Sequence, residues 1–503
     1  MLDLEQYGRI EIYTDVREIT YENVADIVKD AMDSHQINAN TIDYLIKFEA
    51  GMQPKFREKK YRADIDCWCV DNVANEISDF WINYGWGNPI TLVRRDDNES
   101  SIPGEVVTEI NRCYEAEGVR RTTQELGRYV EIGGNGYTYV DVNTDYEDGD
   151  SYFKLHSLNP RCTFIVYSSY YLDKRPMLAV TYSCDKQGQK KYTCISKYWQ
   201  YELDNEYNHT ANSGVKNVLE AIPVVEWIRA TDRMGCFERQ IPEMENLNLL
   251  VSDFTNDVDQ NTQAIWHGND IQFPKDEQGN SIAPKTNEWL LTYTPKDGKQ
   301  PFVKALAVEY DYQGMLNNIV TRRGLILQKA KVPSRNDNSG GSTGIAMSDA
   351  TGWTQAEIEA TRQDQLKEDS KMQEIKLVLK AIKLSSNVPE DSPLKKLRFT
   401  DLKPSIKRQK TYEMTTKMNA FATGVSHGIN PTDMLSAINF FDDPQQVAEN
   451  SKETLKAYQD SVFNGNNKPV GGEDEQKPNA DRLQADNSDQ IGNSPNIDGM
   501  RTE

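Results

Sequence analysis

The stretch KVPSRNDNSGGSTGIAMSDATG, from Lys331 to Gly352, decides how the middle of this 503-residue chain is organised. Pro333 prevents the helix before it from continuing, and the run of Gly, Ser and Asn after it favours a loop. Helical apolar patterns flank the stretch on both sides. The sequence therefore predicts two helices joined by a loop, with basic residues at its leading edge.

The helix before this loop, at 312–332, has a basic side. From Tyr312 to Asn336 there is no acidic residue, and the basic residues are Arg322, Arg323, Lys329, Lys331 and Arg335. Arg322 and Lys329 are seven positions apart, which places them on one side of the helix, off its apolar stripe. Arg323 falls on the stripe, where it must snorkel or meet an acid. The pattern allows a solvated basic face or a site for an anion.

The helix after the loop is long and starts near Gly352. Its second half has a clear apolar face, formed by Ile375, Val378, Leu379 and Ile382. Its first half is too polar for the core of a single subunit. We expect that half to lie against a neighbouring subunit or in solvent.

Upstream, a helix at 241–263 places Ile241, Met244, Leu247, Val251, Phe254 and Val258 on one buried face at steps of three and four. Between this helix and the basic one, residues 264–311 contain short strand and turn patterns. They predict a small module inserted between two helices.

The N-terminal part combines a helical and a strand-rich region. Residues 1 to about 130 have helical periodicity, including a helix with Ile65, Val70, Val73, Ile77 and Trp81 on one face. From about 130 to 230 the period changes to two, which predicts an antiparallel meander. More helices follow between 411 and 463, and the polar, acidic composition after 464 predicts disorder. The fold class is α+β.

Composition limits the possible functions. The net charge of −21 makes the chain a poor general binder of nucleic acid, so any DNA contact must be local or weak. No apolar run is long enough for a membrane span, and the N-terminus is not a secretory signal. The seven cysteines are odd in number and scattered, which predicts reduced thiols. Cys67-Trp68-Cys69 has no second ligand pair nearby, so thiols are favoured over a metal site.

Motifs of catalysis are missing from the sequence. It has no HExxH, no Walker A loop, no GxSxG and no metal-spaced histidine cluster. We predict no catalytic, cofactor-binding or metal-binding residue. The many Asp and Glu side chains leave one enzymatic alternative open, a carboxylate-dependent DNA-processing enzyme.

Three stretches carry a resemblance to a known family. They are NVANEISDFWINYGWGNPI (72–90), IPVVEWIRATDRMGCFERQIPEMENLNLLVSDFTNDVDQ (222–260) and AKVPSRNDNSGGSTGIAMSDATG (330–352). In order and spacing they resemble bacteriophage portal proteins of tailed phages of Gram-positive hosts. The resemblance covers roughly residues 40 to 460, and no resemblance is recognised in the first forty residues.

This resemblance implies a mainly helical portal fold with an antiparallel meander in the wing and a small α/β clip. The implied parts are a wing at 1–240, a first stem helix at 241–263, a clip at 264–311, a second stem helix at 312–332, a tunnel loop at 333–352, a long wing helix and following strand at 353–410, a crown at 411–463 and a disordered acidic tail at 464–503.

The resemblance also implies a non-enzymatic function without cofactors. Portal proteins form a closed homo-oligomeric ring, usually a homododecamer, at one capsid vertex of the virion, through which double-stranded DNA is packaged and ejected. The implied partners are the terminase large subunit, the head-tail adaptor, the scaffold and the major capsid protein, with assembly in the host cytoplasm and no membrane. Another oligomeric virion structural protein is the alternative.

Site residues follow from the same resemblance. The DNA-facing stem residues would be Arg322, Lys329 and Lys331. The tunnel loop would comprise Ser334, Arg335, Asn336, Asn338, Ser339, Gly340, Gly341, Ser342 and Thr343, and the clip would bind partners through Trp266, His267 and Trp289. The alternative for the two tryptophans is the clip's own core. A few basic groups repeated around a ring would touch phosphates without gripping them, since each neutralised phosphate adds affinity that opposes translocation.

Overall fold

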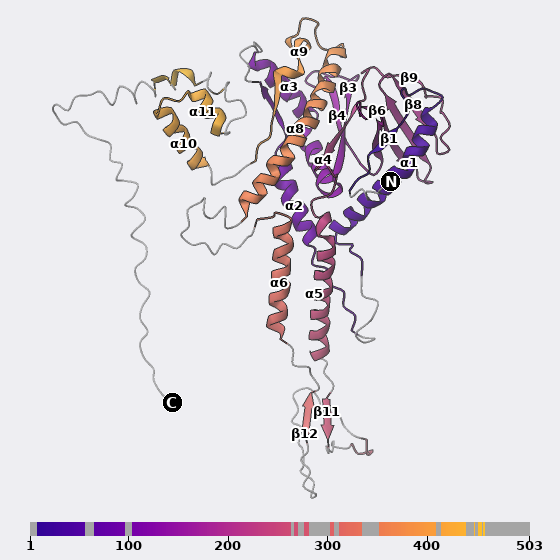
Figure 1. Cartoon of the computed structure of the whole chain (residues 1–503), viewed down its shortest axis with the longest axis vertical. Coiled ribbons are helices and arrows are strands. Elements are labelled where there is room, and N and C mark those ends of the chain that lie inside the picture. The colour runs from indigo at the N-terminus through magenta and orange to yellow at the C-terminus, as the bar shows by residue number, and fades with distance from the viewer. Residues whose placement is uncertain are drawn as a thin grey trace, which may run out of the picture. The chain divides into compact units, whose positions relative to one another are not determined.

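The structure is a computed structural model of the whole chain. It describes residues 8–55, 65–95, 103–262, 266–269, 276–280, 302–305, 311–333, 352–408, 414–438, 447, 451–454 and 456–457. The chain divides into two compact units, Met1–Thr416 and Lys417–Glu503. Helices and mainly antiparallel sheets make up the first unit, which confirms the predicted α+β class (Figure 1).

The N-terminal part is mainly helical, as predicted. After strand β1 (Ile12–Thr14) come α1 (Val24–Glu49), α2 (Val73–Trp86), β2 (Thr91–Arg94), α3 (Gly104–Ala116) and α4 (Val119–Gly133). The prediction that Ile65 and Val70 belong to the helix of Trp81 is wrong, because α2 begins at Val73. The residues before α2 are extended instead, and side chains of a later helix bind their backbone, as described below.

The strands form two main sheets rather than one meander. Strands β5 (Thr163–Ser168), β6 (Pro176–Cys184), β7 (Lys190–Ser196), β8 (Trp199–Leu203) and β9 (Val215–Lys216) do follow one another as an antiparallel meander, and β1 joins them parallel to β5. Strands β3 (Asn135–Val142), β4 (Phe153–Leu158) and β10 (Val224–Ile228) form a separate sheet in the order β10-β3-β4.

Each sheet packs against its own helices. Val24, Val28 and other α1 residues cover the six-stranded sheet in one apolar cluster. The three-stranded sheet packs with α3, α4 and the second half of α8 (Trp353–Leu384), where Ile375 and Ile382 are buried. The two cores explain the two sheets, since each strand set needs a helical layer of its own.

Two long helices lie side by side in Figure 1. They are α5 (Ile241–Thr262), entered through the short helix η1 (Glu238–Gln240), and α6 (Tyr312–Lys329). Between them in sequence, β11 (Trp266–Asn269) and β12 (Phe302–Ala305) pair as an antiparallel hairpin. The predicted helix, inserted module and second helix are therefore present, within the residues that the structure describes.

Past α8, the chain forms α9 (Pro393–Lys396), η2 (Phe399–Asp401) and β13 (Leu402–Ser405), which pairs with β2. Helices α10 (Met414–Ser426) and α11 (Pro431–Ile438) follow. The predicted disordered tail at 464–503 lies outside the described residues.

The prediction for the polar first half of α8 is also wrong. Ala356, Ala360, Gln363 and Lys367 are buried within the chain itself, not left for solvent or a neighbouring subunit. The carbonyl oxygen of Gly85 on α2 accepts a hydrogen bond from Lys367, and Arg408, after β13, pairs with Asp364. These contacts make the burial possible, since a buried charge is tolerated when it is paired or hydrogen-bonded. Ile358 on the opposite side is 60% exposed.

Candidate nucleic-acid interface

Helix α6 is anchored mainly through its C-terminal end. Its buried residue is Ile326, and the buried residues Ala330 and Val332 follow it. The indole Nε1 of Trp81, on α2, donates a hydrogen bond of 3.1 Å to the carbonyl oxygen of Ala330. Most of the helix therefore presents exposed side chains, while the point where the chain leaves it is fixed.

Helix α5 is held by a polar ladder that the apolar pattern did not predict. Asn248, Ser252 and Asn256 are spaced by four and buried. Their side chains accept hydrogen bonds from the backbone amides of Asp71, Cys69 and Cys67, at 2.9, 3.0 and 2.8 Å. The segment before α2 therefore lies along α5 in an extended conformation.

The ladder changes which face of α5 is buried. Met244 and Leu247 are buried as predicted, but Val258 is 39% exposed and Val251 and Phe254 are only half-buried. Small polar residues repeating at a spacing of four were the available signal, because such side chains can satisfy a neighbouring backbone.

Replacing Asn256 by alanine tests the ladder. The change removes both hydrogen bonds between this side chain and the backbone of Cys67, which leaves buried polar groups without partners. We expect urea unfolding to show a loss of about 1–3 kcal/mol, with faster labelling of the exposed Cys67 thiol. Asn246→Ala, an exposed change on the same helix, is the matched control. Equal stability of the two variants would contradict the ladder's role.

Most basic residues around α6 are neutralised by acids from other elements. Lys329 pairs with Glu243 of α5, and Lys331 pairs with Glu359 of α8. Arg323 meets an acid, as its place on the apolar stripe required, with its Nε 3.1 Å from Asp71 and a second contact to Glu76. The absence of acids in this span of sequence is therefore offset by acids brought from elsewhere.

Arg322 differs from its neighbours. It is exposed, and its Nε donates to Oδ1 of Asn318 on the same helix at 3.0 Å. Within the part of the chain that the structure describes, it forms no ion pair. Of the predicted DNA-facing residues, Arg322 thus keeps an uncompensated charge, while Lys329 and Lys331 do not.

The predicted tunnel-loop residues Ser334 to Thr343 lie outside the described residues, but both ends of this segment are described. Pro333 is buried, and a Cβ added to Gly352 would lie 3.9 Å from the Cα of Pro333. Gly352 has a φ of +85°, which favours glycine. Pro333 and Gly352, the two described ends of this segment, therefore lie close together.

The departure point has a built-in helix stop. The amides of Lys331 and Val332 donate to the carbonyls of Gln328 and Leu327 at 3.0 and 2.9 Å, the pattern of a Schellman motif. Lys331 has a φ of +59°, in a position where glycine is usual. Its ion pair with Glu359 then joins the end of α6 to the start of α8.

A cluster of buried charges adjoins this junction. Glu359 also lies 3.8 Å from Arg229, whose Nε donates to Glu131 of α4 at 3.0 Å. Although partial burial acts in the opposite direction, Lys331 and Arg229 hold the pKa of Glu359 below its usual value. Ion pairs with little exposure to water thus connect the end of α6 and the start of α8 to α4.

The predicted clip residues are only partly described. His267 is exposed, and its ring centroid lies 5.3 Å from that of Phe302. The backbone of Trp266 pairs opposite Ala305, and Trp289 lies outside the described residues. Partner binding by these residues stays a prediction.

Metal binding and membrane insertion find no support among the described residues. Among the described residues, no group of three or more His, Cys, Asp or Glu side chains is placed to hold a metal ion. The seven cysteines are free, and the Sγ atoms of Cys67 and Cys69 are 3.7 Å apart. None of the helices in the described part combines the length and apolar character needed to cross a bilayer.

The described part of the chain thus combines a helix pair joined by a hairpin, a two-sheet body and a long helix that follows them. The chain belongs to the family described as phage portal protein, SPP1 Gp6-like, whose model matches residues 21–461. It is thus a phage portal protein, a structural component of a phage particle rather than a member of an enzyme family.

The chain was also compared with curated proteins and with solved structures. No curated protein matches the chain. Among solved structures, it is similar to a chain described as the neck of an empty GTA particle computed with C6 symmetry, with 10% sequence identity and a TM-score of 0.40, over 73% of this chain and 90% of that one.

Proposed function

We propose that copies of this chain form a closed ring, a homododecamer, at one capsid vertex, and that double-stranded DNA passes through it during packaging and ejection. The observation that carries the proposal is the charge on the helix pair. Helix α5 has five acids and no Lys or Arg, whereas α6 has three basic residues and no acid, and only Arg322 among those three lacks an ion pair within the described residues.

One uncompensated guanidinium per copy would give weak, transient contacts with the phosphates of a duplex that moves through the ring. Phosphate contacts carry no sequence information, and their affinity grows with each counterion released. Neutralising Lys329 and Lys331 internally keeps the number of such contacts small, so the ring touches DNA transiently and does not hold it. The net charge of −21 per copy acts in the same direction.

The parts of the chain receive roles on the same basis. We assign the wing to 1–240, the stem to 241–263 and 312–332, the clip to 264–311, the tunnel loop to 333–352, the long wing helix with its strand to 353–410 and the crown to 411–463. The clip hairpin would dock the terminase large subunit during packaging and the head-tail adaptor afterwards. Scaffold and major capsid protein would contact the outer parts during assembly in the host cytoplasm.

Charge reversal at the stem tests the conduit. Arg322→Glu is expected to leave rings intact, because the side chain is exposed, and to lower the amount of DNA packaged per particle. Adding Lys329→Glu should have a smaller further effect, since Lys329 already pairs with Glu243. Electron microscopy and native mass would count the copies, and nuclease-protected DNA would report packaging.

Controls separate the possible outcomes of this experiment. Arg121→Glu reverses a charge that is 86% exposed on α4, away from the stem, and should package normally. Normal packaging by the Arg322→Glu variant would contradict the assignment of this residue to the channel. An oligomer without a through-channel would favour another virion structural protein.

A further inference from the structure

The first described residues of the chain lie outside the family match yet are firmly docked. The family model begins at residue 21, whereas Ile12, Tyr13 and Thr14 pair in parallel with Val166, Tyr167 and Ser168 of β5. A Cβ at Gly8, whose φ is +93°, would come within 1.8 Å of the carbonyl oxygen of Asp232. The segment at 8–14, here called the clasp, therefore lies against both the six-stranded sheet and the turn that precedes α5.

Arg9 is the most deeply buried charge of the clasp. Its side chain is 1% exposed, and its guanidinium donates to the carbonyl oxygen of Gly133, at 3.0 Å, and to the carboxylate of Glu238. Glu238 belongs to η1, directly before α5, and also accepts a hydrogen bond of 2.8 Å from the amide of Gly235. Arg9 thus links the end of α4 to the entrance of α5.

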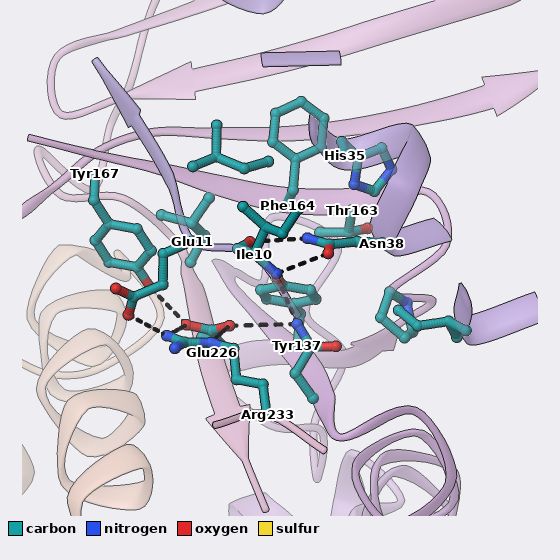
Figure 2. Close-up of a pocket in the computed structure, with 15 residues that line it drawn as sticks. Ile10, Glu11, His35, Asn38, Tyr137, Thr163, Phe164, Tyr167, Glu226 and Arg233 are labelled. Carbon is teal, nitrogen blue, oxygen red and sulfur yellow. Dashed lines mark hydrogen bonds and ion pairs between the residues drawn. The ribbon is translucent and has the colours of Figure 1, made fainter. Parts of the chain in front are cut away.

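The neighbouring residues of the clasp are recognised individually. Both the amide and the carbonyl of Ile10 bond to the side-chain amide of Asn38 on α1, each at 2.8 Å. Glu11 lies 2.8 Å from the guanidinium of Arg233, as Figure 2 shows. The surrounding residues therefore bind an extended backbone that carries a basic side chain, Arg9, and an acidic side chain, Glu11, two positions apart.

Arg233 extends the contact into the sheets. It forms two bonds of 3.0 Å to Glu226 of β10, which also accepts a hydrogen bond of 2.8 Å from Tyr167 of β5 (Figure 2). Arg233 has a φ of +55°, a conformation that its surroundings must maintain. The turn at 229–237 is thereby held from one side by β10 and from the other by the clasp.

We propose that β5, α1 and the 229–238 turn form a strand-addition site, that residues 8–14 of this chain occupy it, and that this occupation fixes the entrance of α5 relative to the six-stranded sheet. Strand addition supplies backbone hydrogen bonds, and pockets for particular side chains supply specificity. The buried site of Arg9, formed by the carbonyl oxygen of Gly133 and the carboxylate of Glu238, is such a pocket. The proposal concerns the join between wing and stem helix, and it does not depend on the assignment of DNA-facing residues.

The test is hydrogen–deuterium exchange of the full-length chain and its Arg9→Ala variant. We expect amides at 229–240 and in the first turn of α5 to exchange roughly tenfold faster in the variant, with β6, β7 and β8 unchanged, because the buried link to Glu238 is lost. Arg17→Ala, a change at an exposed position just after the clasp, is the matched control and should exchange like the wild type.

A second variant approaches the link from the other partner. Glu238→Gln should reproduce the local increase, and combining it with Arg9→Ala should add little, because both changes remove one interaction. Unchanged exchange at 229–240 in either single variant would overturn the proposal. A uniform increase over the whole chain would overturn it too, since that would indicate general destabilisation and not a local clasp.

Discussion

Replacing Glu131 by alanine is expected to lower the free energy of unfolding by about 3–5 kcal/mol, because it removes the hydrogen-bonded counter-charge of buried Arg229 and leaves only the longer contact with Glu359. Glu131 on α4 is fully buried. One carboxylate oxygen accepts a hydrogen bond from the indole of Trp86, and the other accepts one from Arg229, each at 3.0 Å. The measurement is urea unfolding followed by tryptophan fluorescence, for which Trp86 is a reporter beside the changed residue.

Two further variants make this prediction specific. Glu125→Ala lies on the same helix but removes an exposed pair with Arg121, so its cost should stay below about 1 kcal/mol. Glu131→Gln can keep an acceptor for Trp86 while losing the charge facing Arg229, and should fall between the two. If Glu131→Ala and Glu125→Ala were equally stable, the contact with Glu359 would be sufficient for Arg229, and the buried pair with Glu131 would add no stability.

The helical part of the fold could be predicted from the sequence because its signals are local. The helices at 241–262 and 312–329 follow from apolar residues at steps of three and four, and Pro333 marks the end of the second. The division of the strands into two sheets could not be predicted, since strands of both sheets share the same alternation. Only the choice of helical layer, α1 or α8, separates them.

The candidate interface was harder to predict, because its charges are set by distant partners. The basic side of α6 was visible, but Glu243 lies 86 positions from Lys329, and Asp71 lies 252 positions from Arg323. Pattern alone does not show which of these charges are cancelled. The sequence pattern of the clasp was even less informative. An extended segment of seven residues has no helical periodicity, and its burial depends on the distant residues that it contacts.

The second large effect concerns Lys367, a buried lysine on α8 that is 4% exposed. Its Nζ donates to the carbonyl oxygen of Gly85 at 3.0 Å and lies 4.3 Å from the ring centroid of Trp86. Burial lowers the pKa of Lys367 to about 8, although Glu131 and Asp364 act in the opposite direction. A free lysine has a pKa of about 10.4, so the unfolded chain binds this proton more tightly than the folded one.

The sign of the pH dependence follows from this difference. Below pH 8 the folded protein carries the full cost of a buried charge, about 3 kcal/mol, and that cost declines as the pH rises toward 10.4. Lys367→Met removes the cost at the loss of one hydrogen bond and a cation–π contact, together worth about 1–2 kcal/mol. We therefore expect the variant to be more stable than the wild type at pH 7, by about 1–2 kcal/mol.

The difference in stability between Lys367→Met and the wild type is measured at pH 7 and at pH 9.5. Groups that titrate equally in both proteins cancel in this difference, so its change reports on Lys367. The advantage of Lys367→Met should shrink by about 2 kcal/mol between these two values, because Lys367 of the wild type loses its proton while folded. Lys376→Met, on the exposed side of the same helix, should leave the unfolding midpoint close to that of the wild type at both pH values. An advantage that stays the same at pH 9.5 would contradict this prediction, because it would show that Glu131 and Asp364 hold Lys367 in its charged form in the folded protein.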